Sequence, residues 1–335
     1  MRKSKNILLL IMFLLCGVIS YGQSITWDAA AGTIRCEGVA IGTTATVTTD
    51  LGDRSVEVVD RTSLIALRNA SADLSCVCTS NITDMSSLFN DKRTFNQDIG
   101  RWDTSNVIDM NNMFRKAWRF NQNISNWDVS SVENMERMFF NADDFNNGEA
   151  TNTGSNPLTW NTQSVTNMKE MFFSGVFNQD IGSWDVSNVE NMALMFKFTR
   201  RFGNAGQPMN WTTTSLTKMQ EMFRNTDAFN QDISGWDTSN VTNMESLFRQ
   251  NDNFNNNGQP LTWDTSSVQN MTALFYQAKA FNQDISGWDT SNVNQMQNMF
   301  REAVDFNQDI SGWDVSSVTT MERMFQNASL FNGNL

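Results

Sequence analysis

The stretch Phe229–Phe248, FNQDISGWDTSNVTNMESLF, is the unit from which most of the chain is built. Close copies recur from about residue 82 to residue 335, and tryptophans mark their phase at intervals of 24 to 33 residues. Self-similarity at such a period indicates an array of stacked units rather than one globular core. The phase-marking residues are Trp102, Trp127, Trp160, Trp184, Trp211, Trp236, Trp263, Trp288 and Trp313.

Each copy contains the pattern V-x-x-M-x-x-(M/L)-F, as in Val241, Met244, Leu247 and Phe248. Offsets of 0, 3, 6 and 7 residues place these side chains on one face of a helix. A Ser or Thr stands two residues before the Val in nine of ten copies, which is the N-cap position. We therefore expect a short helix in each copy, capped by Ser80, Ser105, Ser130, Ser187, Thr214, Ser239, Ser266, Ser291 or Ser316.

Where the preceding loop is longer, the approach to the tryptophan alternates apolar and polar residues, as in Pro260–Trp263, and this alternation is typical of a strand. The commoner form, I-S-G-W, has one more residue, which is consistent with a bulge at the Gly. The sequence thus predicts an α/β repeat, a solenoid with one short strand and one short helix per coil of roughly 25 residues. A single copy buries too little apolar surface to offset the entropy of ordering it. Neighbouring copies must therefore stack, and the tryptophans are predicted to form the repeat core.

The first 22 residues are predicted to be a signal peptide. Arg2, Lys3 and Lys5 precede the apolar run Ile7–Leu15, and small residues favour cleavage between Gly22 and Gln23. The run is too short to span a membrane, and lipidation at Cys16 is an alternative. The mature chain then divides into an N-terminal capping segment, residues 23–80, and about ten repeats, residues 81–335, of which the last is incomplete.

The capping segment contains the only cysteines of the predicted mature chain. Two strands, Thr44–Thr49 and Ser55–Val59, and a helix at Thr62–Asn69 capped by Asp60 are expected there. In an exported chain, Cys36 is expected to form a disulfide with Cys76 or Cys78 and to leave one thiol over. A metal at the Cys-x-Cys pair is disfavoured, because the chain has no histidine and no second pair.

The charge and the missing residue types exclude several kinds of function. The net charge is −12, and removal of three basic residues with the signal peptide leaves 21 basic against 36 acidic residues. With no basic patch, nucleic acid is not an expected partner. The absence of histidine excludes Ser-His-Asp and Cys-His sites, and no phosphate-binding glycine motif occurs. We therefore predict no enzyme and no cofactor.

Acidic residues recur in two registers. One set follows the tryptophans, and both sets are expected to bond backbone N–H groups in turns, with calcium held between stacked rows as the alternative. The first set is Asp103, Asp128, Asp185, Asp237, Asp264, Asp289 and Asp314, and the second is Asp98, Asp180, Asp232, Asp284 and Asp309.

An asparagine follows the second Phe of each copy, and we expect these residues to form an internal ladder by bonding the backbone of the next coil. A row of ligand-binding amides is the alternative. The set is Asn96, Asn121, Asn146, Asn178, Asn230, Asn255, Asn282, Asn307 and Asn332, with Gly203 as the exception. A long loop, Asn146–Pro157, and shorter ones at Gly203–Pro208 and Asn255–Pro260 interrupt the array. Such insertions often lie on a binding face, but tolerated drift is the simpler explanation.

The pattern F-N-Q-D-I-S-x-W-D-T/V-S-N/S-V-x-x-M-x-x-M-F resembles the repeat of BspA-like leucine-rich-repeat surface proteins, and is also similar to mycoplasma lipoprotein-associated repeats. The match covers about residues 82–335. The resemblance implies an exported, cell-surface or extracellular protein with a leucine-rich-repeat-like fold, associated with adhesion to proteins or other cells. It carries over no catalytic residues. No C-terminal sorting or anchoring segment is recognisable, so the mode of attachment stays open.

Three functional hypotheses follow. The first is an exported scaffold for binding and adhesion to surface or extracellular proteins, with no transmembrane segment in the mature chain. The second is a structural component that self-associates end to end, because the last copy stops after Phe331-Asn332 without a capping repeat. The third is a carbohydrate-active enzyme, which would need one close carboxylate pair outside the repeat register.

Overall fold

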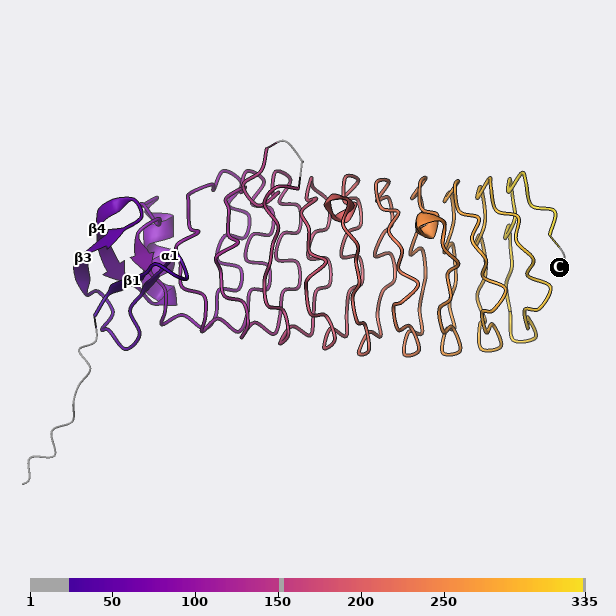
Figure 1. The fold of residues 1–335 in the computed structure, drawn as a ribbon, viewed down its shortest axis with the longest axis horizontal. Helices are drawn as coiled ribbons and strands as arrows, with labels where there is room; N and C mark the ends of the chain where they lie inside the picture. The colour runs from indigo at the N-terminus through magenta and orange to yellow at the C-terminus, as the bar shows by residue number, and fades with distance from the viewer. Residues whose placement is uncertain (1–23, 151–153, 334–335) are drawn as a thin grey trace, which may run out of the picture.

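The computed structural model describes residues 24–150 and 154–333. The predicted signal peptide and the Gly22–Gln23 cleavage site lie outside the described residues. A small N-terminal segment with regular secondary structure adjoins a long array, in which successive repeats stack along the long axis of the molecule (Figure 1).

The N-terminal segment, residues 24–80, holds five strands and one helix. β1 (Thr26–Asp28) and β2 (Thr33–Arg35) form an antiparallel pair. The second sheet has the order β3-β4-β5, in which β3 (Thr44–Thr49) and β4 (Gly52–Val58) are antiparallel and β5 (Val77–Cys78) is parallel to β4. The hairpin of β3 and β4 lies where alternating residues predicted two strands.

Helix α1 (Arg61–Asn69) begins where the sequence predicts, at an Asp60 N-cap. The Asp60 carboxylate accepts from the backbone N–H of Ser63, and the Ser63 hydroxyl accepts from the backbone N–H of Asp60, so a complete capping box fixes the first turn. Leu64 is the buried residue of the helix and belongs to the same apolar core as the repeats.

The repeats are largely irregular, with little regular secondary structure and an aromatic ladder of about 25-residue spacing. Two Phe columns stack from repeat to repeat, with centroids 5.5 Å apart between Phe114 and Phe139 and 5.7 Å between Phe120 and Phe145. Within one repeat, the rings of Phe114 and Phe120 are 3.9 Å apart. These columns, the tryptophans and the buried Met residues form one continuous core that also includes Leu64 and Leu74 of the N-terminal segment.

The predicted helix of each repeat is wrong. Among the described residues, the repeats contain no α-helix, and only η1 (Asn204–Gly206) and η2 (Asn256–Gly258) are short 3₁₀ turns. Two residues in every repeat, five and nine positions after the Val or its equivalent, have positive φ, such as Asn112 (54°) and Lys116 (58°). Left-handed residues at these intervals are incompatible with a right-handed helix.

A chain of turns replaces the helix, and it keeps the same three-residue spacing. The N–H of Val107, Met113 and Ala117 each donates to the carbonyl three residues earlier, so the buried side chains recur at helix-like intervals without helical geometry. The Ser and Thr residues predicted as N-caps are consequently not caps. Ser105, for example, donates its N–H and its hydroxyl to Asp103.

The backbone groups between these turns pair with neighbouring repeats. The N–H groups of Met110, Asn112, Phe114 and Lys116 donate to carbonyls of the next repeat, and this pattern recurs along the array as four parallel columns of hydrogen bonds. Two further columns run the opposite way, as from Ile108 N–H to Thr83 O and from Arg119 N–H to Arg93 O. Repeats therefore share their backbone bonds with their neighbours.

The predicted strand before each tryptophan is also wrong. The parallel bridges between repeats run instead through the segment predicted as helix, two residues after the Val, from Asp84 and Asp109 to Gln295 and Thr320. Near the tryptophans, the bridge that the described residues make is Trp102 with Ile34 of β2. The bridges between repeats thus lie in a different segment of each repeat from the predicted strand.

Candidate functional site

The nine phase-marking tryptophans form a buried ladder. Trp102 is fully buried, and Trp313, the least buried of them, is 8% exposed. Each indole Nε1 donates to an aliphatic residue's carbonyl in the preceding repeat or segment, as from Trp236 to Met209 (3.2 Å) and from Trp102 to Leu74 (2.9 Å). The ladder therefore holds repeats together, and most neighbouring indoles also stack, as Trp184 does with Trp211 and Trp288 with Trp313.

Both acidic registers form turns. Each aspartate accepts from the backbone N–H two residues later, as Asp264 does from Ser266 (3.0 Å) and Asp232 from Ser234 (3.0 Å). The hydroxyl of Ser266, and then its backbone N–H, lowers the pKa of Asp264. In the part of the chain that the structure describes, no group of three or more acidic, Cys or His residues could hold a metal ion.

One pair of carboxylates lies outside these registers. Asp227 and Asp252 line a shallow hollow together with Arg200 and Lys279, whose ammonium lies 2.7 Å from Asp252. Burial, and to a lesser extent the charge of Asp252, raises the pKa of Asp227. Because Lys279 holds Asp252 as an ion pair, the hollow sets the half-buried Asp227 beside a carboxylate that already has a counter-charge.

The asparagine ladder forms as the sequence predicts. Asn282 Oδ1 accepts from the backbone N–H of Asn307 (2.9 Å), and the same bond recurs from repeat to repeat. Asn178 Oδ1 accepts from the backbone N–H groups of both Gly203 and Ala205. Gly203 has no side-chain amide, so the ladder is interrupted between Gly203 and Asn230. These amides are used inside the array.

A second set of buried asparagines was missed by the sequence reasoning. Asn147, Asn204 and Asn256 lie in the three insertion loops, and each is fully buried. Their Oδ1 atoms accept from the backbone N–H of Ile124, Ile181 and Ile233 at 2.8 to 2.9 Å. The signal available in the sequence is an Asn two residues after the Phe in each of these loops. Each loop is therefore anchored to the repeat before it.

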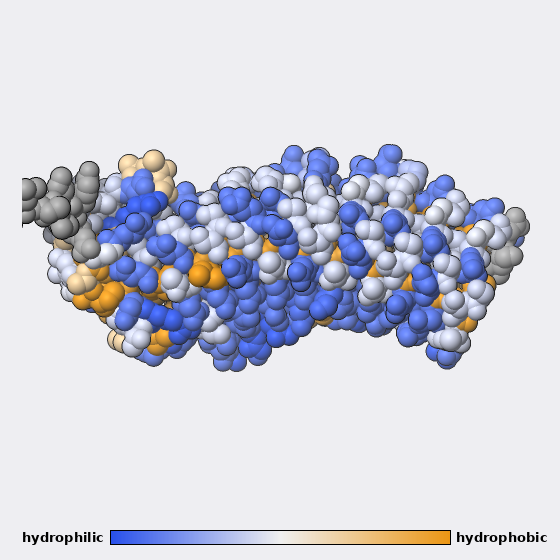
Figure 2. Space-filling view, turned by 90° about the horizontal axis from the view of Figure 1, so that it is seen from below, coloured by the Kyte–Doolittle hydropathy of each residue, from blue (hydrophilic) through white to orange (hydrophobic). Residues whose placement is uncertain are grey.

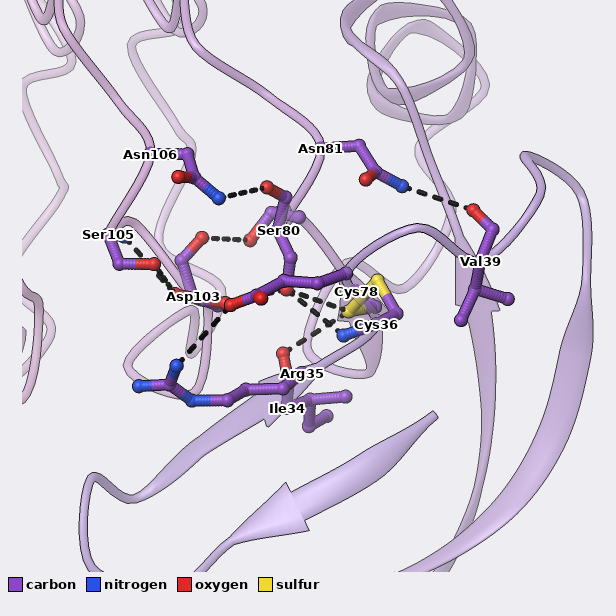
Figure 3. The surroundings of a disulfide bond; sticks show 12 residues. Ile34, Arg35, Cys36, Val39, Cys78, Ser80, Asn81, Asp103, Ser105 and Asn106 are labelled. Atoms are coloured by element: carbon purple, nitrogen blue, oxygen red, sulfur yellow. Dashed lines mark hydrogen bonds and ion pairs between the residues drawn. A yellow bond between two sulfur atoms is a disulfide. The ribbon is translucent and has the colours of Figure 1, made fainter. Parts of the chain in front are cut away.

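The disulfide joins Cys36 to Cys78 (Figure 3). Cys76 is left as a free thiol. The Ser80 hydroxyl accepts from the N–H of Cys36 and donates to the buried carboxylate of Asp103. Asp103 also accepts from Ser105 of the first complete repeat. The disulfide joins the residue after β2 to β5, and the hydrogen bonds of Ser80 connect it to the beginning of the array.

The N-terminal segment also donates hydrogen bonds to backbone carbonyl groups of the first repeat, on the side that faces the segment. Arg61 donates to the carbonyls of Asp84 (3.1 Å) and Ser86 (2.6 Å) from α1. Arg68 donates to the carbonyl of Leu88 from the last turn of the same helix. In the repeats these positions accept from a preceding repeat, so guanidinium groups take the place of backbone N–H groups here.

The side chains that vary most between copies lie on the turns four, five, eight and nine positions after each Val, which we call the outer turn face, and most of them are half-buried. It includes ten varied positions that a helix in each repeat would expose to solvent, but in the structure Glu170 is buried and the other nine are half-buried: Arg115, Lys116, Glu136, Arg137, Lys169, Glu170, Gln220, Glu221, Arg249 and Gln250. Arg137 holds Glu170 through two bonds of 2.9 Å. Ion pairs of this kind join adjacent repeats across the face. The Glu170 side chain is buried in this pair, with 8% of the residue exposed.

Aromatic and cationic side chains alternate on the same face. The ring of Tyr276 lies between two guanidinium groups, 4.8 Å from that of Arg249 and 5.2 Å from that of Arg301. Burial, and then the charge of Arg224, lowers the pKa of Arg249. Figure 2 shows another feature of the array surface, with hydrophilic residues in rows along the long axis and hydrophobic ones confined to narrow lines between them.

No helix within the described residues is long and apolar enough to cross a membrane.

Comparison with known proteins places the chain by its repeats. No curated protein and no solved structure matches it. A family model described as "Mycoplasma protein of unknown function, DUF285" matches residues 62–156, 149–208, 204–260 and 256–335. Together these matches reach from α1 to the end of the array, across the whole aromatic ladder. The chain is therefore a member of the DUF285 repeat family.

Proposed function

We propose that the chain is an exported, non-enzymatic scaffold of the cell surface, which binds proteins or other cells through its repeat array. Export rests on the signal-peptide prediction for residues 1–22. In this proposal the array is a leucine-rich-repeat-like solenoid of the BspA-like type, although its coils are built from turns. The N-terminal segment acts as its cap.

The outer turn face carries this proposal. The interior repeats the same residue types from coil to coil, whereas the outer turn face changes from charged to aromatic to small side chains on a fixed backbone. A stack of this kind presents a long, rigid surface whose side chains can differ without disturbing the core. Tyr and Arg, the pair at Tyr276 and Arg249, are residues that often contribute most to binding at interfaces.

Binding of the full chain to immobilised extracellular-matrix and cell-surface proteins tests the proposal. We expect at least one partner to bind, and expect Arg249→Ala with Tyr276→Ala to weaken binding about tenfold or more. A matched control changes Asn188 and Asn240 to Ala, because both are exposed and lie at the corner before the Val, away from the outer turn face. Binding that both double variants weaken equally, or no binding at all, would contradict the proposal.

Self-association is a second candidate, favoured by one apolar hollow. Ile310, Trp313, Met321, Met324 and Phe325 line an open space of about 360 Å³ in the last described repeat. Met321 is 39% exposed. Light scattering at increasing concentration tests this candidate, since mass that grows without any partner would support it, and Met321→Glu should then abolish the growth.

A further inference from the structure

Two hollows open at equivalent places beside the tryptophan ladder. The first, about 400 Å³, lies between the repeats of Trp211 and Trp236, and the second, about 260 Å³, lies between those of Trp263 and Trp288. The two are separated by two repeats, which is roughly 10 Å if each step resembles the spacing of paired strands. Neither hollow is part of the outer turn face.

A difference of one residue accounts for both hollows. One residue separates Met209 from Trp211, whereas two separate Ile233 from Trp236 in the repeat that follows. The second hollow has the same arrangement, in which Leu261–Trp263 precedes Ile285–Trp288. Adjacent layers of unequal length cannot match atom for atom, and an extra residue bulges out of the ladder. The mismatch leaves space at the edge.

Glycine keeps that space open. Gly235 lines the first hollow and Gly287 the second, and a Cβ built on either meets no atom within 4 Å. Neither has a positive φ, so the backbone does not require glycine there. At the third junction of this type, beside Trp184, the order is Gly-Ser, and Ser183 stands at the equivalent position.

The polar groups around the hollows are neutral or acidic. Asp232 lines the first and Asp284 the second, and each uses Oδ1 for its own turn, which leaves Oδ2 as an acceptor for a ligand. Asn210 and Thr212 add an amide and a hydroxyl to the first hollow. No Lys or Arg lines either hollow, so an anionic ligand would meet a carboxylate without a counter-charge.

The rings present their edges to the hollows. Trp211 and Trp236 stack with centroids 5.6 Å apart at 12°, and Trp263 and Trp288 with centroids 6.3 Å apart at 6°. Each ring covers one face of its partner, and only 3–4% of each indole is exposed, so no open ring face borders the hollows. Because the edge of an aromatic ring is the positive part of its quadrupole, these indoles do not favour a cation.

We propose that the two hollows bind a neutral, linear polysaccharide, with one sugar residue seated in each. Sugar hydroxyls donate to the carboxylates of Asp232 and Asp284 and exchange hydrogen bonds with Asn210, Thr212 and Thr262. The apolar C–H groups of the ring lie against the indole rims. A chain that advances along the array reaches both hollows at once, so the second contact adds avidity to the first. This inference goes beyond the proposed function, since it concerns a different ligand and a different edge.

Isothermal titration of the full chain with cellohexaose, mannohexaose, maltohexaose and chitohexaose tests the proposal. We expect at least one hexasaccharide to bind, and its disaccharide to bind more than tenfold more weakly because it reaches only one hollow. The double variant Gly235→Ser with Gly287→Ser introduces at both hollows the residue that stands at the equivalent position 183, and should weaken binding at least tenfold. Gly312→Ser is the matched control, because Gly312 has the same place before Trp313 and equal room for a Cβ.

A second variant separates ligand contact from folding. Asp232→Asn with Asp284→Asn keeps the Oδ1 acceptor of each turn and removes only the carboxylate charge, so near-ultraviolet circular dichroism should be unchanged while binding weakens. The proposal is overturned if no hexasaccharide binds, if the double glycine variant binds as well as the parent chain, or if oligouronates or oligolysine bind through these glycines instead. None of these outcomes affects protein binding by the outer turn face, so the two proposals fail separately.

Discussion

The N-terminal segment and the repeat array reach stability by different routes. In the segment, strands and helix α1 satisfy most backbone groups locally, and a disulfide closes 42 residues of sequence. In the array, each repeat bonds mainly to its neighbours, through backbone columns, stacked rings and the asparagine ladder. The comparison teaches that regular secondary structure is one way to satisfy a backbone, and that a stack of equal coils is another.

The largest expected effect comes from removing a rung of the array. Trp211→Ala empties a buried site 3% exposed and removes the Nε1 bond to Ile181, so we expect about 3–5 kcal/mol lower stability. Trp27→Ala, in a partly buried site of β1, should cost less than half as much. Urea denaturation measures both. Equal losses of stability in the two variants would contradict the prediction that a tryptophan of the ladder stabilises the chain more than Trp27 does.

The disulfide should matter mainly to the segment. Reduction, or Cys36→Ser with Cys78→Ser, removes a crosslink whose usual contribution is about 2–4 kcal/mol. We expect faster hydrogen exchange in β2 and β5 and little change beyond about Trp127, because the array bonds from repeat to repeat. Cys76→Ser is the control, since Cys76 is free. Exchange that increases along the whole array would show that the two regions unfold as one.

The asparagine ladder should contribute a smaller amount per rung. Asn282→Ala removes an acceptor used by the N–H of Asn307 and by the amide of Gln308, both at 2.9 Å, and should cost about 1–2 kcal/mol. Asn292→Ala removes one exposed bond to Ser266 and should cost about 0.5 kcal/mol or less. Thermal unfolding of both variants gives the comparison. A loss at Asn292 as large as that at Asn282 would remove the special role of the ladder.

The smallest effect tests the turns that replace the predicted helix. Ala273 and Ala278 are both buried, but Ala273 has a φ of 54°, where glycine is not strained, whereas Ala278 is not among the residues with positive φ. Ala273→Gly should leave stability unchanged or raise it by up to about 1 kcal/mol, and Ala278→Gly should lower it by about 1 kcal/mol. Calorimetry distinguishes them. A helix at this position would instead make both substitutions destabilising.

Much of the array could be predicted from the sequence because its period is independent of local geometry. The burial of Trp236, the stacking of neighbours and the bonds of Asn282 follow from where these residues recur. The Asp60 cap of α1 was also predictable, since a helix start has its own local chemistry. The helix in each repeat was not, because spacing of three and four residues is shared by a helix and by successive turns. A helix and a series of turns differ in where alternate backbone N–H groups donate, and here they donate to another repeat. The sequence of one repeat does not contain this information.

The candidate sites show the same limit. The outer turn face could be located from its variation between copies, as at Arg249 and Gln250. The buried role of Asn256 and the space beside Gly235 could not, because each depends on how one repeat meets a neighbour of different length. Such mismatches exist only once two unequal repeats are placed next to each other.

The four parallel columns of backbone bonds make the array electrically directional. Peptide dipoles aligned head to tail add up, as they do in a helix, and the two opposing columns cancel only part of the sum. Its negative pole then lies at the first repeat, where Arg61 and Arg68 of α1 place two positive charges against the carbonyl groups. A molecule lying along the array would meet a potential that changes from one end to the other, so its two possible orientations would differ in energy.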